Sequence, residues 1–352
     1  MAKRKILIFS TSYFPLVGGA EVAIKEITDQ LGDKYDFEML TAHLGAKLPS
    51  KEKVGNVMVH RFCGKLTLAL FGVFKIFVLG KFDLFWCVQV SYASGPAYAY
   101  NILKFWKKVP IILTLQEGDS EEHLTKRHFG LIDLSWRLAM TRSAYVTAIS
   151  KYLATRAEKY GAKREKLIVV PNGVASLFFN TKKKEHENTV LIHTGRLVRK
   201  NAVEVIVQAL NFLPGNVKLV SVGDGPVKIS GPRVIQKSFM SQERLAEELA
   251  QADIFVRPSR SEGLGNSFLE AMAVGLPIIG TNVGGIPDFL TDRETGLFCK
   301  VDDPEDLAEK VKLIASDKYL REKIVASAEN LMKEKYTWEK ISQQMYEVFT
   351  KA

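Results

Sequence analysis

The stretch "DIFVRPSRSEGLGNSFLEAMAVGLPIIGT" (residues 253–281) decides the fold. Its first part, 253–259, is rich in β-branched and aromatic residues and predicts a buried strand. The segment 267–275 predicts a short helix that ends at a glycine, and 276–281 predicts a second strand. Strand, helix and strand in this order predict a parallel sheet that is covered by helices.

The same alternation continues on both sides of this stretch. Further strands are predicted at 5–10, 37–40, 84–90, 110–116, 144–150, 189–195 and 217–225, and further helices at 19–31, 151–161, 201–213 and 241–252. A break near 172–188, which includes the charged, turn-rich stretch 180–188, divides the elements into two series of similar size. The predicted fold is therefore α/β, with two doubly wound domains whose ligand sites lie at the carboxyl ends of strands. The expected active site is the cleft between them.

Charge is distributed unevenly along the 352 residues, which carry a net charge of +10. Residues 1–172 contain 25 Lys and Arg against 15 Asp and Glu, whereas the remainder contains 24 of each. A basic half attracts an anionic membrane, a phosphorylated acceptor or nucleic acid. Nucleic acid is the least favoured of these, because no nucleic-acid motif accompanies the lysines. A solvated basic surface is the alternative.

Three features of the sequence favour a cytoplasmic protein. Cys63, Cys87 and Cys299 are widely spaced and odd in number, which is typical of buried thiols in a reducing compartment. The apolar run near the N-terminus is only four residues long, and no small-residue cleavage site follows it. The longest charge-free apolar run, 66–74, is far shorter than the roughly 20 residues that span a bilayer.

The lysine-containing apolar segment 65–81 has two interpretations. Together with the basic first half of the chain, it predicts a peripheral contact with the inner face of the membrane. Alternatively, residues 66–79 form a buried helix.

Two glycine- or cation-bearing loops follow predicted strands. "SYFPLVGGAE" (12–21) precedes the first helix, and Gly18 and Gly19 leave room for a phosphate at its N-terminus. It does not match G-x-G-x-x-G, so no dinucleotide fingerprint is supported, and a tight turn is the alternative. "HTGRLVRKN" (193–201) concentrates cations at a strand end, which suits a diphosphate; the alternative is solvated surface charge. Its three cations are Arg196, Arg199 and Lys200.

Two further motifs are weaker on their own. "VGDGP" (222–226) is a turn after a strand, and its Gly223 and Asp224 are further candidates for the same ligand site. "VGGIP" (283–287) forms either a turn or another wall of the same cleft.

The loop before the 267–275 helix also has two interpretations. Ser267 and Glu270 match a capping box, in which each side chain satisfies the backbone N–H of the other residue. That leaves Glu262 and the neighbouring glycines unexplained. In the functional interpretation, the loop N–H groups face a phosphate, Glu270 accepts hydrogen bonds from ribose hydroxyls, and Glu262 accepts them from sugar hydroxyls. In this interpretation the loop binds a nucleotide sugar. Its candidate binding residues are Glu262, Gly263, Gly265, Asn266, Ser267, Phe268 and Glu270.

The motifs GGAE, PNGV, GRL with a following Lys, VGDGP, E-G-x-G-x(4)-E, GG-x-P and TGLF occur in this order. The sequence thereby resembles the retaining GT-B glycosyltransferases of family 4 over nearly its whole length. The resemblance implies an acceptor-binding Rossmann-like domain at 1–172 and a nucleotide-sugar-binding one at 173–335. It further implies that a C-terminal helix within 336–352 returns to the first domain.

The resemblance also implies roles for particular residues. Arg196 and Lys200 match the diphosphate-binding pair, and with Glu262 they form the expected catalytic set; Glu270 matches the ribose ligand. The family commonly spaces the Arg–Lys pair one residue wider, so Lys200 shares or exchanges its role with Arg199. Gly18 and Gly19 match a loop that closes on the diphosphate.

One departure concerns the acceptor side. Many members of the family have a histidine where this chain has Gln116. Because glutamine does not titrate, an acid–base role at this position is in doubt. Glu117 and Asp119 are the neighbouring candidates for acceptor contact.

The implied activity is transfer of a hexose-type sugar from a nucleotide diphosphate sugar to a hydroxyl of a glycan or lipid-linked acceptor. Such transfer with retention at the anomeric carbon would serve cell-surface polysaccharide or glycolipid synthesis. No cofactor and no metal are expected, because the chain contains no Asp-x-Asp motif. The alternatives are a GT-B nucleotide-sugar epimerase or phosphorylase, and a nucleotide-sugar-binding regulator without turnover.

Overall fold

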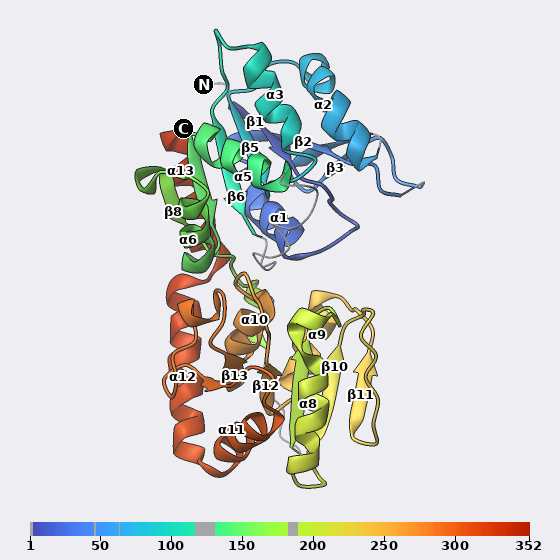
Figure 1. Cartoon of the computed structure of the whole chain (residues 1–352), viewed down its shortest axis with the longest axis vertical. Coiled ribbons are helices and arrows are strands. Elements are labelled where there is room, and N and C mark those ends of the chain that lie inside the picture. Colours follow the sequence, from blue (N-terminus) through green and yellow to red (C-terminus); the bar gives the residue numbers. More distant parts are fainter. Residues whose placement is uncertain (1–2, 46, 63, 117–130, 182–188) are drawn as a thin grey trace. The chain divides into compact units, whose positions relative to one another are not determined.

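The computed structural model describes residues 3–45, 47–62, 64–116, 131–181 and 189–352 (Figure 1). The chain forms two compact units. The first contains residues 1–172 and 338–352, and the second contains residues 173–337. The chain therefore passes from the first unit to the second after Asn172 and returns after Thr337.

The first unit contains an eight-stranded sheet in the order β3-β4-β2-β1-β5-β6-β7-β8. Neighbouring strands pair in parallel, except that β3 and β4 are antiparallel. The strands are β1 Arg4–Phe9, β2 Tyr35–Thr41, β3 Lys51–Val54, β4 Val57–Arg61, β5 Leu84–Val88, β6 Ile111–Leu115, β7 Tyr145–Ala148 and β8 Leu167–Val169.

Helices cover both faces of this sheet. Successive side chains of a strand point to opposite faces, and β5 shows the two environments. The Trp86 ring contacts Phe349 of α13 at 5.2 Å between centroids, whereas the next ring along, Phe85, contacts Tyr100 of α3 at 5.4 Å. The helices are α1 Gly19–Leu31, α2 Lys65–Leu79, α3 Gly95–Leu103, α5 Leu131–Arg142, α6 Lys151–Lys159 and α13 Trp338–Lys351, with the 3₁₀ helix η2 Arg164–Lys166.

The second unit contains an all-parallel six-stranded sheet in the order β11-β10-β9-β12-β13-β14. The two parallel sheets confirm the predicted α/β class. The strands are β9 Val190–Thr194, β10 Lys218–Val222, β11 Val234–Lys237, β12 Ile254–Arg257, β13 Ile278–Thr281 and β14 Leu297–Cys299.

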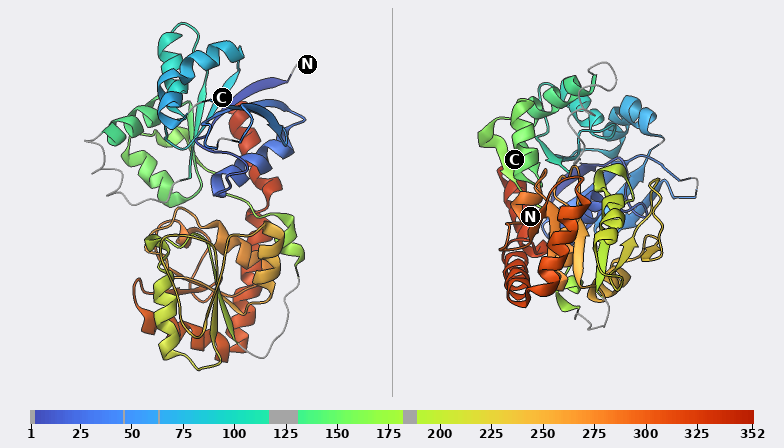
Figure 2. Two further views of the ribbon diagram at one scale, coloured as in Figure 1. Left: turned by 90° about the vertical axis from the view of Figure 1, so that its right-hand side faces the viewer. Right: turned by 60° about the horizontal axis from the view of Figure 1, so that its bottom comes forward.

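The second sheet is also covered on both faces (Figure 2). Ile254 and Val256 belong to the core shared with α8 and α11, and Phe255 faces the other way, toward Phe268 of α10 at 5.1 Å. Arg257 follows with the same alternation as Phe255, so it points to the α10 side. The helices are α7 Ser176–Asn180, α8 Val203–Ala209, α9 Gln242–Ala250, α10 Asn266–Val274, α11 Pro304–Ser316 and α12 Lys318–Lys335, with the 3₁₀ helices η3 Arg199–Asn201, η4 Leu210–Phe212 and η5 Ile286–Asp288.

Each sheet has a switch point, where the chain begins to add strands on the other side of the first strand of that sheet. In the second sheet, β9 lies between β10 and β12, so the loops that leave β9 and β12 turn to opposite faces. In the first sheet, β1 lies in the same way between β2 and β5. Ligands of doubly wound sheets bind at the carboxyl ends of the strands at such a point.

The predicted elements differ from the structure in two instructive places. The single helix expected at 201–213 is divided into η3, α8 and η4, because Ala202 adopts a left-handed conformation with φ of 53° between η3 and α8. The antiparallel pair β3–β4 was not expected, and Gly55 (φ of 58°) forms its turn.

The α2 helix is not a buried helix. Its buried residues are Leu68, Gly72, Val73 and Ile76, while six of its large apolar side chains are exposed. The alternative of a buried helix at 66–79 is therefore wrong for the outward side of α2. Within the described ranges, no helix is both long enough and apolar enough to cross a membrane.

The cysteines agree with the expectation where the structure describes them. Cys87 and Cys299 are buried free thiols, and burial raises the pKa of the Cys299 thiol to about 12. Cys63 lies outside the described residues.

Candidate functional site

Four loops of the second unit leave the carboxyl ends of β9, β10, β12 and β13, and glycines let them pack backbone to backbone. Gly223 has a φ of 135°, and a Cβ there would lie 2.1 Å from the carbonyl oxygen of Gly195. Gly284 has a φ of 57°, and a Cβ there would lie 1.9 Å from the carbonyl oxygen of Glu262. Both contacts are far below van der Waals distance. Gly223 of VGDGP and Gly284 of VGGIP are therefore required by the neighbouring loops, whatever else they contact.

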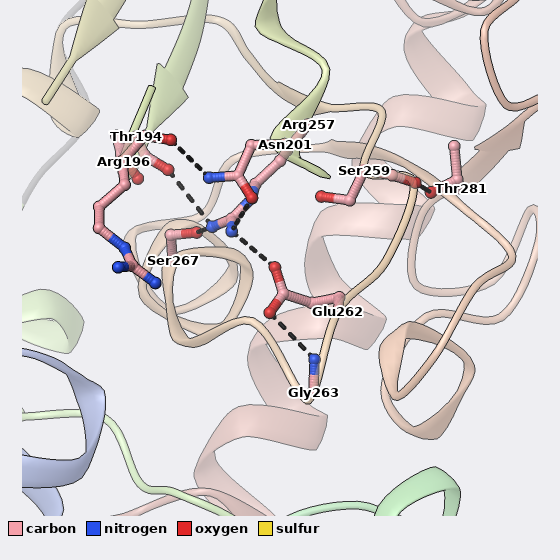
Figure 3. A network of polar contacts seen from close by, with 9 residues as sticks. All are labelled: Thr194, Arg196, Asn201, Arg257, Ser259, Glu262, Gly263, Ser267 and Thr281. Atoms are coloured by element: carbon pink, nitrogen blue, oxygen red, sulfur yellow. Dashed lines mark hydrogen bonds and ion pairs between the residues drawn. The ribbon is translucent and has the colours of Figure 1, made fainter. Parts of the chain in front are cut away.

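Arg257, the last residue of β12, joins the segments that follow β9 and β12 (Figure 3). Its Nη2 donates to Glu262 Oε2 at 2.6 Å and to Asn201 Oδ1 at 3.0 Å. Its Nη1 donates to the Ser267 hydroxyl and, at 3.4 Å, to the carbonyl oxygen of Thr194. One buried guanidinium thus holds together the end of β9, the Asn201 side chain, the loop after β12 and the first turn of α10. The Arg257 cluster consists of Arg257 and its partners Thr194, Asn201, Glu262 and Ser267.

Glu262 is held by this cluster and is only 8% exposed. Its second oxygen, Oε1, accepts a hydrogen bond from the N–H of Gly263 at 3.1 Å. The structure thus places the carboxylate expected to face a sugar against Arg257 as a buried ion pair. Because a carboxylate has about four lone-pair sites, these contacts leave it able to accept a hydroxyl as well.

The predicted capping box does not form. The α10 helix begins at Asn266, its N-cap is Gly265 with a φ of 91°, and no side chain caps it. Ser267 lies inside the first turn, where its hydroxyl accepts from Arg257. The capping interpretation of Ser267 and Glu270 is therefore wrong, because a glycine occupies the cap position and an arginine engages the serine.

Glu270 lies one turn into α10 and is half-buried. Burial raises the pKa of its carboxyl to about 7, and the positive charge of Arg257 opposes that rise. Within the described part of the chain, its side chain makes no hydrogen bond or ion pair. A desolvated carboxyl without a partner is typical of functional sites.

The cationic loop after β9 is held through its backbone. The Asn201 amide donates to the carbonyl oxygen of Arg196 at 2.6 Å, and the N–H of Arg260 donates to that of Lys200 at 2.7 Å. The Arg260 guanidinium also donates to the carbonyl oxygen of Arg199. Arg260 itself is fixed by carboxylates of Asp302 and Glu204.

The cationic side chains of this loop differ in exposure. Arg196 and Arg199 are exposed, and Lys200 is partly buried. The Arg196 side chain lies apart from Arg257 and its partners in Figure 3. Within the described residues it makes no hydrogen bond or ion pair. Its guanidinium is thus presented to solvent from a fixed backbone.

Two neighbouring groups have structural partners. The Asp224 carboxylate accepts from the N–H of Phe239 at 2.8 Å and so fixes the loop after β11. His193 on β9 is fully buried, and burial together with Arg257 lowers its pKa to about 3. The imidazole is therefore neutral at ordinary pH and does not act as a proton donor there.

In the first unit, the GGAE loop contains a carboxylate at the helix start. Gly18 is the N-cap of α1, and a Cβ at this position would lie 2.9 Å from Glu21 Oε2. Glu21 is buried and accepts a hydrogen bond from the Ser12 hydroxyl at 2.7 Å. Gly19 opens the helix.

The acceptor candidates are only partly described. Gln116 directly follows β6, and its Oε1 accepts a hydrogen bond from the Asn172 amide at 3.3 Å. Glu117 and Asp119 lie outside the described residues.

Arg257 and Asn201 were missed by the sequence reasoning. The available signal was the arginine itself, which ends the otherwise apolar strand "DIFVR" immediately before the loop. A charge at the last position of a buried strand needs a partner, and Glu262 lies five residues later.

The fold and this site define the class of protein. Two doubly wound units, the second with cations, loop amides and carboxylates at its switch point, have the architecture of GT-B glycosyltransferases. The family model for glycosyl transferases group 1 matches residues 176–331, and the model for glycosyltransferase family 4 matches residues 17–176. The chain therefore belongs to the family 4 glycosyltransferases, and it is an enzyme of GT-B type.

Individual relatives agree over most of their length. An uncharacterized glycosyltransferase of Methanocaldococcus jannaschii is 25% identical over 355 residues, covering 95% of each chain. The N-acetyl-alpha-D-glucosaminyl L-malate synthase of Bacillus anthracis is 26% identical over 383 residues, covering 98% of this chain and 97% of the relative. The crystal structure of Anabaena HepE in complex with UDP and glucose superposes with a TM-score of 0.80 at 20% identity, covering 99% and 100% of the two chains.

Proposed function

We propose that this enzyme transfers a hexose-type sugar from a nucleotide diphosphate sugar to a hydroxyl group, with retention at the anomeric carbon. One observation carries the proposal. At the β9–β12 switch point, Arg257 holds together a loop that presents the exposed guanidinium of Arg196 and a helix start that carries the unpartnered carboxyl of Glu270. Cation, helix N-terminus and carboxyl are the groups that a nucleoside diphosphate requires.

Three groups of residues bind three parts of the donor: the diphosphate, the ribose and the sugar. Arg196 and Lys200, with Arg199 as neighbour, bind the diphosphate together with the amides of residues 265–267. The Phe268 amide does not contribute, because it donates to the Gly265 carbonyl oxygen at 2.9 Å. Glu270 accepts hydrogen bonds from the ribose hydroxyls, and Glu262 accepts them from the sugar. The UDP and glucose in the HepE crystal structure support a nucleotide-sugar donor for the present chain.

Catalysis is then mainly electrostatic. The bond between the anomeric carbon and the diphosphate oxygen breaks, and negative charge grows on the leaving diphosphate. Fixed cations and amide dipoles aimed at that charge lower the barrier, and removal of one such group typically costs about 100-fold or more in turnover. Arg196 and Lys200 supply this stabilisation without a metal ion, so transfer persists in excess EDTA.

The acceptor is a hydroxyl of a glycan or a lipid-linked intermediate, and the enzyme works at the inner face of a membrane. The exposed apolar side of α2 and the excess of positive charge in the first 172 residues support this location. Synthesis of a cell-surface polysaccharide or glycolipid is the role that fits it.

A thermal-shift screen of UDP-, GDP- and ADP-sugars tests the donor. Sugars of one nucleotide should stabilise the protein. The nucleotide sugar that stabilises it most is then tested as donor with a panel of acceptors, which includes L-malate as a small soluble molecule with a hydroxyl group. NMR of the product should show the anomeric configuration of the donor.

The same assay separates the alternatives. Release of nucleoside diphosphate only when acceptor is present supports transfer. Release or sugar isomerisation without acceptor indicates an epimerase, and binding without turnover across the panel indicates a regulator. Absence of stabilisation by every nucleotide sugar contradicts the proposal.

A further inference from the structure

The α2 helix is apolar on every side. Among its fifteen residues only Lys65, Thr67 and Lys75 are polar. One side packs into the first unit through Leu68, Gly72, Val73 and Ile76, and six of the other large side chains are exposed to water. These exposed residues are Leu66, Leu70, Phe71, Phe74, Phe77 and Val78. An apolar surface of this extent on a helix indicates a partner that covers it.

The same surface continues onto the end of α3, which packs beside α2 (Figure 1). A Cβ at Gly72 would lie 2.7 Å from Pro96 Cγ of α3, so the missing side chain allows the two helices to approach closely. The Phe77 ring lies 4.9 Å from that of Tyr100. Beyond this contact Ile102, Leu103, Phe105 and Trp106 are between 52% and 71% exposed. We call the exposed side of α2 together with residues 102–106 the α2–α3 face.

The charge around this face has one sign. Between residues 64 and 116 the sequence contains six lysines, at positions 65, 75, 81, 104, 107 and 108, and a single acidic residue, Asp83. The Asp83 carboxylate accepts a hydrogen bond from the backbone N–H of Lys5 at 2.8 Å. The Lys104 ammonium lies 5.3 Å from the Phe77 ring centroid and 5.4 Å from that of Tyr100, so charge and aromatic surface are interleaved.

We propose that the α2–α3 face docks on the surface of an anionic phospholipid bilayer. The α2 helix lies in the interfacial plane, its leucines and phenylalanines enter the boundary between headgroups and acyl chains, and the lysines contact lipid phosphates. Lysine stems extend along apolar surface while their ammonium groups reach the headgroups. The exposed Trp106 and Phe105 are side chains that favour this interface.

The charge of the α2–α3 face favours a bilayer, and not a second copy of the chain, as the partner that covers it. Two copies of the α2–α3 face would bring two lysine-rich surfaces together with almost no acidic residue between them, and such juxtaposition of like charges disfavours association. An anionic bilayer supplies both the apolar phase and the opposite charge. Docking is also independent of sugar transfer, because none of these residues belongs to the donor site described above.

Intrinsic fluorescence provides a direct test. The sequence contains four tryptophans, and Trp86, Trp136 and Trp338 are at most 3% exposed, whereas Trp106 is 70% exposed. Vesicles of phosphatidylcholine with about 30 mol% phosphatidylglycerol should shift the emission of the full chain to the blue as Trp106 leaves water. The protein should co-sediment with these vesicles, less with pure phosphatidylcholine, and less again near 0.5 M salt, where the Debye length is roughly 4 Å.

Variants test whether vesicle binding and the fluorescence shift depend on the α2–α3 face. Trp106→Phe should keep co-sedimentation while losing the blue shift, and Phe105→Ser with Trp106→Ser should lose both. Lys107→Glu with Lys108→Glu should weaken binding about tenfold or more. The matched controls are Lys163→Glu with Lys166→Glu, an exposed pair elsewhere in the first unit, and Tyr319→Ser, an exposed aromatic in the second; both should bind as the wild type does.

Two results would overturn the proposal. One is wild-type protein that neither co-sediments with anionic vesicles at low salt nor shifts its emission. The other is a blue shift that follows protein concentration without lipid, with a dimer in sedimentation velocity, which would assign the face to a second copy. Because vesicle binding is measured without any nucleotide sugar, failure here removes the membrane location but leaves the sugar-transfer proposal intact. Failure of sugar transfer likewise leaves the docking proposal intact.

Discussion

The Arg257 cluster and the α2–α3 face depart from ordinary burial in opposite directions. In the second unit, a guanidinium and a carboxylate that are each 8% exposed lie beneath the strand-end loops. In the first unit, side chains such as Val78 at 77% and Phe105 at 71% exposure face water. A buried charge costs folding free energy unless it is paired, and a large exposed apolar surface stays in unfavourable contact with water until something covers it. Each therefore indicates a partner: an internal one for Arg257 and an external one for α2.

The comparison predicts that the two regions respond oppositely to mutation. Removing a partner inside the Arg257 cluster leaves an unsatisfied charge, whereas removing apolar atoms from the α2–α3 face relieves an exposed surface. The first kind of change should reduce stability and activity, and the second should affect only membrane binding.

The largest effect is expected for Arg257→Met. It leaves the buried Glu262 carboxylate without its cation, and such a change typically lowers the free energy of unfolding by about 3–5 kcal/mol. Thermal and urea unfolding measure it. Adding Glu262→Gln removes the stranded charge and should recover much of the loss, whereas the same instability in single and double variants would contradict the role given to the ion pair.

The next effect concerns Arg196 and Lys200. Replacing either with Ala should reduce turnover by about two orders of magnitude or more, because charge on the leaving diphosphate loses a fixed cation. Release of nucleoside diphosphate from the identified donor is the readout. Arg244→Ala, an exposed arginine on α9, is the matched control and should be active; near-wild-type turnover in Arg196→Ala would refute the assignment.

Glu270 provides a prediction with a defined pH window. Its folded pKa of about 7 lies above the ordinary value of 4.5, so between these pH values the folded state holds more protons than the unfolded state. The free energy of unfolding therefore falls as pH rises through this window. Above it, the full cost of ionising the buried Glu270 carboxyl is present. Glu270→Gln should match wild type near pH 4 and exceed its unfolding free energy at pH 8 by about 1–2 kcal/mol.

The same carboxyl should make donor binding pH-dependent. Ribose hydroxyls donate more strongly to an ionised carboxylate, so wild-type affinity should fall as pH drops below about 7. Glu270→Gln should bind the donor about tenfold more weakly at pH 8 and with a flatter pH profile. Calorimetric titration across this range measures both, and an unchanged profile in the variant would remove Glu270 from the donor site.

The smallest effect is expected on the α2–α3 face. Phe105→Ser with Trp106→Ser should change the unfolding free energy by no more than about 0.5 kcal/mol, as is usual for exposed positions. Transfer to a water-soluble acceptor should be unchanged. A marked loss of stability would show that these side chains belong to the core of the first unit and would remove the contrast between the two regions.

Much of the fold followed from hydrophobic pattern. The helix predicted at 19–31 is α1, and the strand–helix–strand order of 253–281 is β12, α10 and β13, because buried strands and their covering helices have distinct periodicities. The hairpin β3–β4 was missed because its first strand, "KEKV", is largely polar and exposed. Whether α2 is buried could not be predicted, because a helix that is apolar on all sides has no amphipathic pattern.

Sequence motifs located the candidate site, but they did not predict which of its side chains contact one another. The cations after β9 and the carboxylates around α10 were recognisable from their places at strand ends. The sequence did not show that Arg257 takes the Ser267 hydroxyl and the Glu262 carboxylate, because Asn201 and Thr194, the other groups that complete the cluster, are more than fifty residues away. Contacts at such separation depend on the order of strands in the sheet.

A crystal structure of the protein with the nucleotide that stabilises it tests the central claim most directly. We expect the diphosphate within hydrogen-bonding distance of the Arg196 guanidinium and the first-turn amides of α10, with the ribose hydroxyls on the Glu270 carboxylate. A nucleotide bound away from the carboxyl ends of β9 and β12, or one that makes no contact with Arg196 and Glu270, would contradict the account.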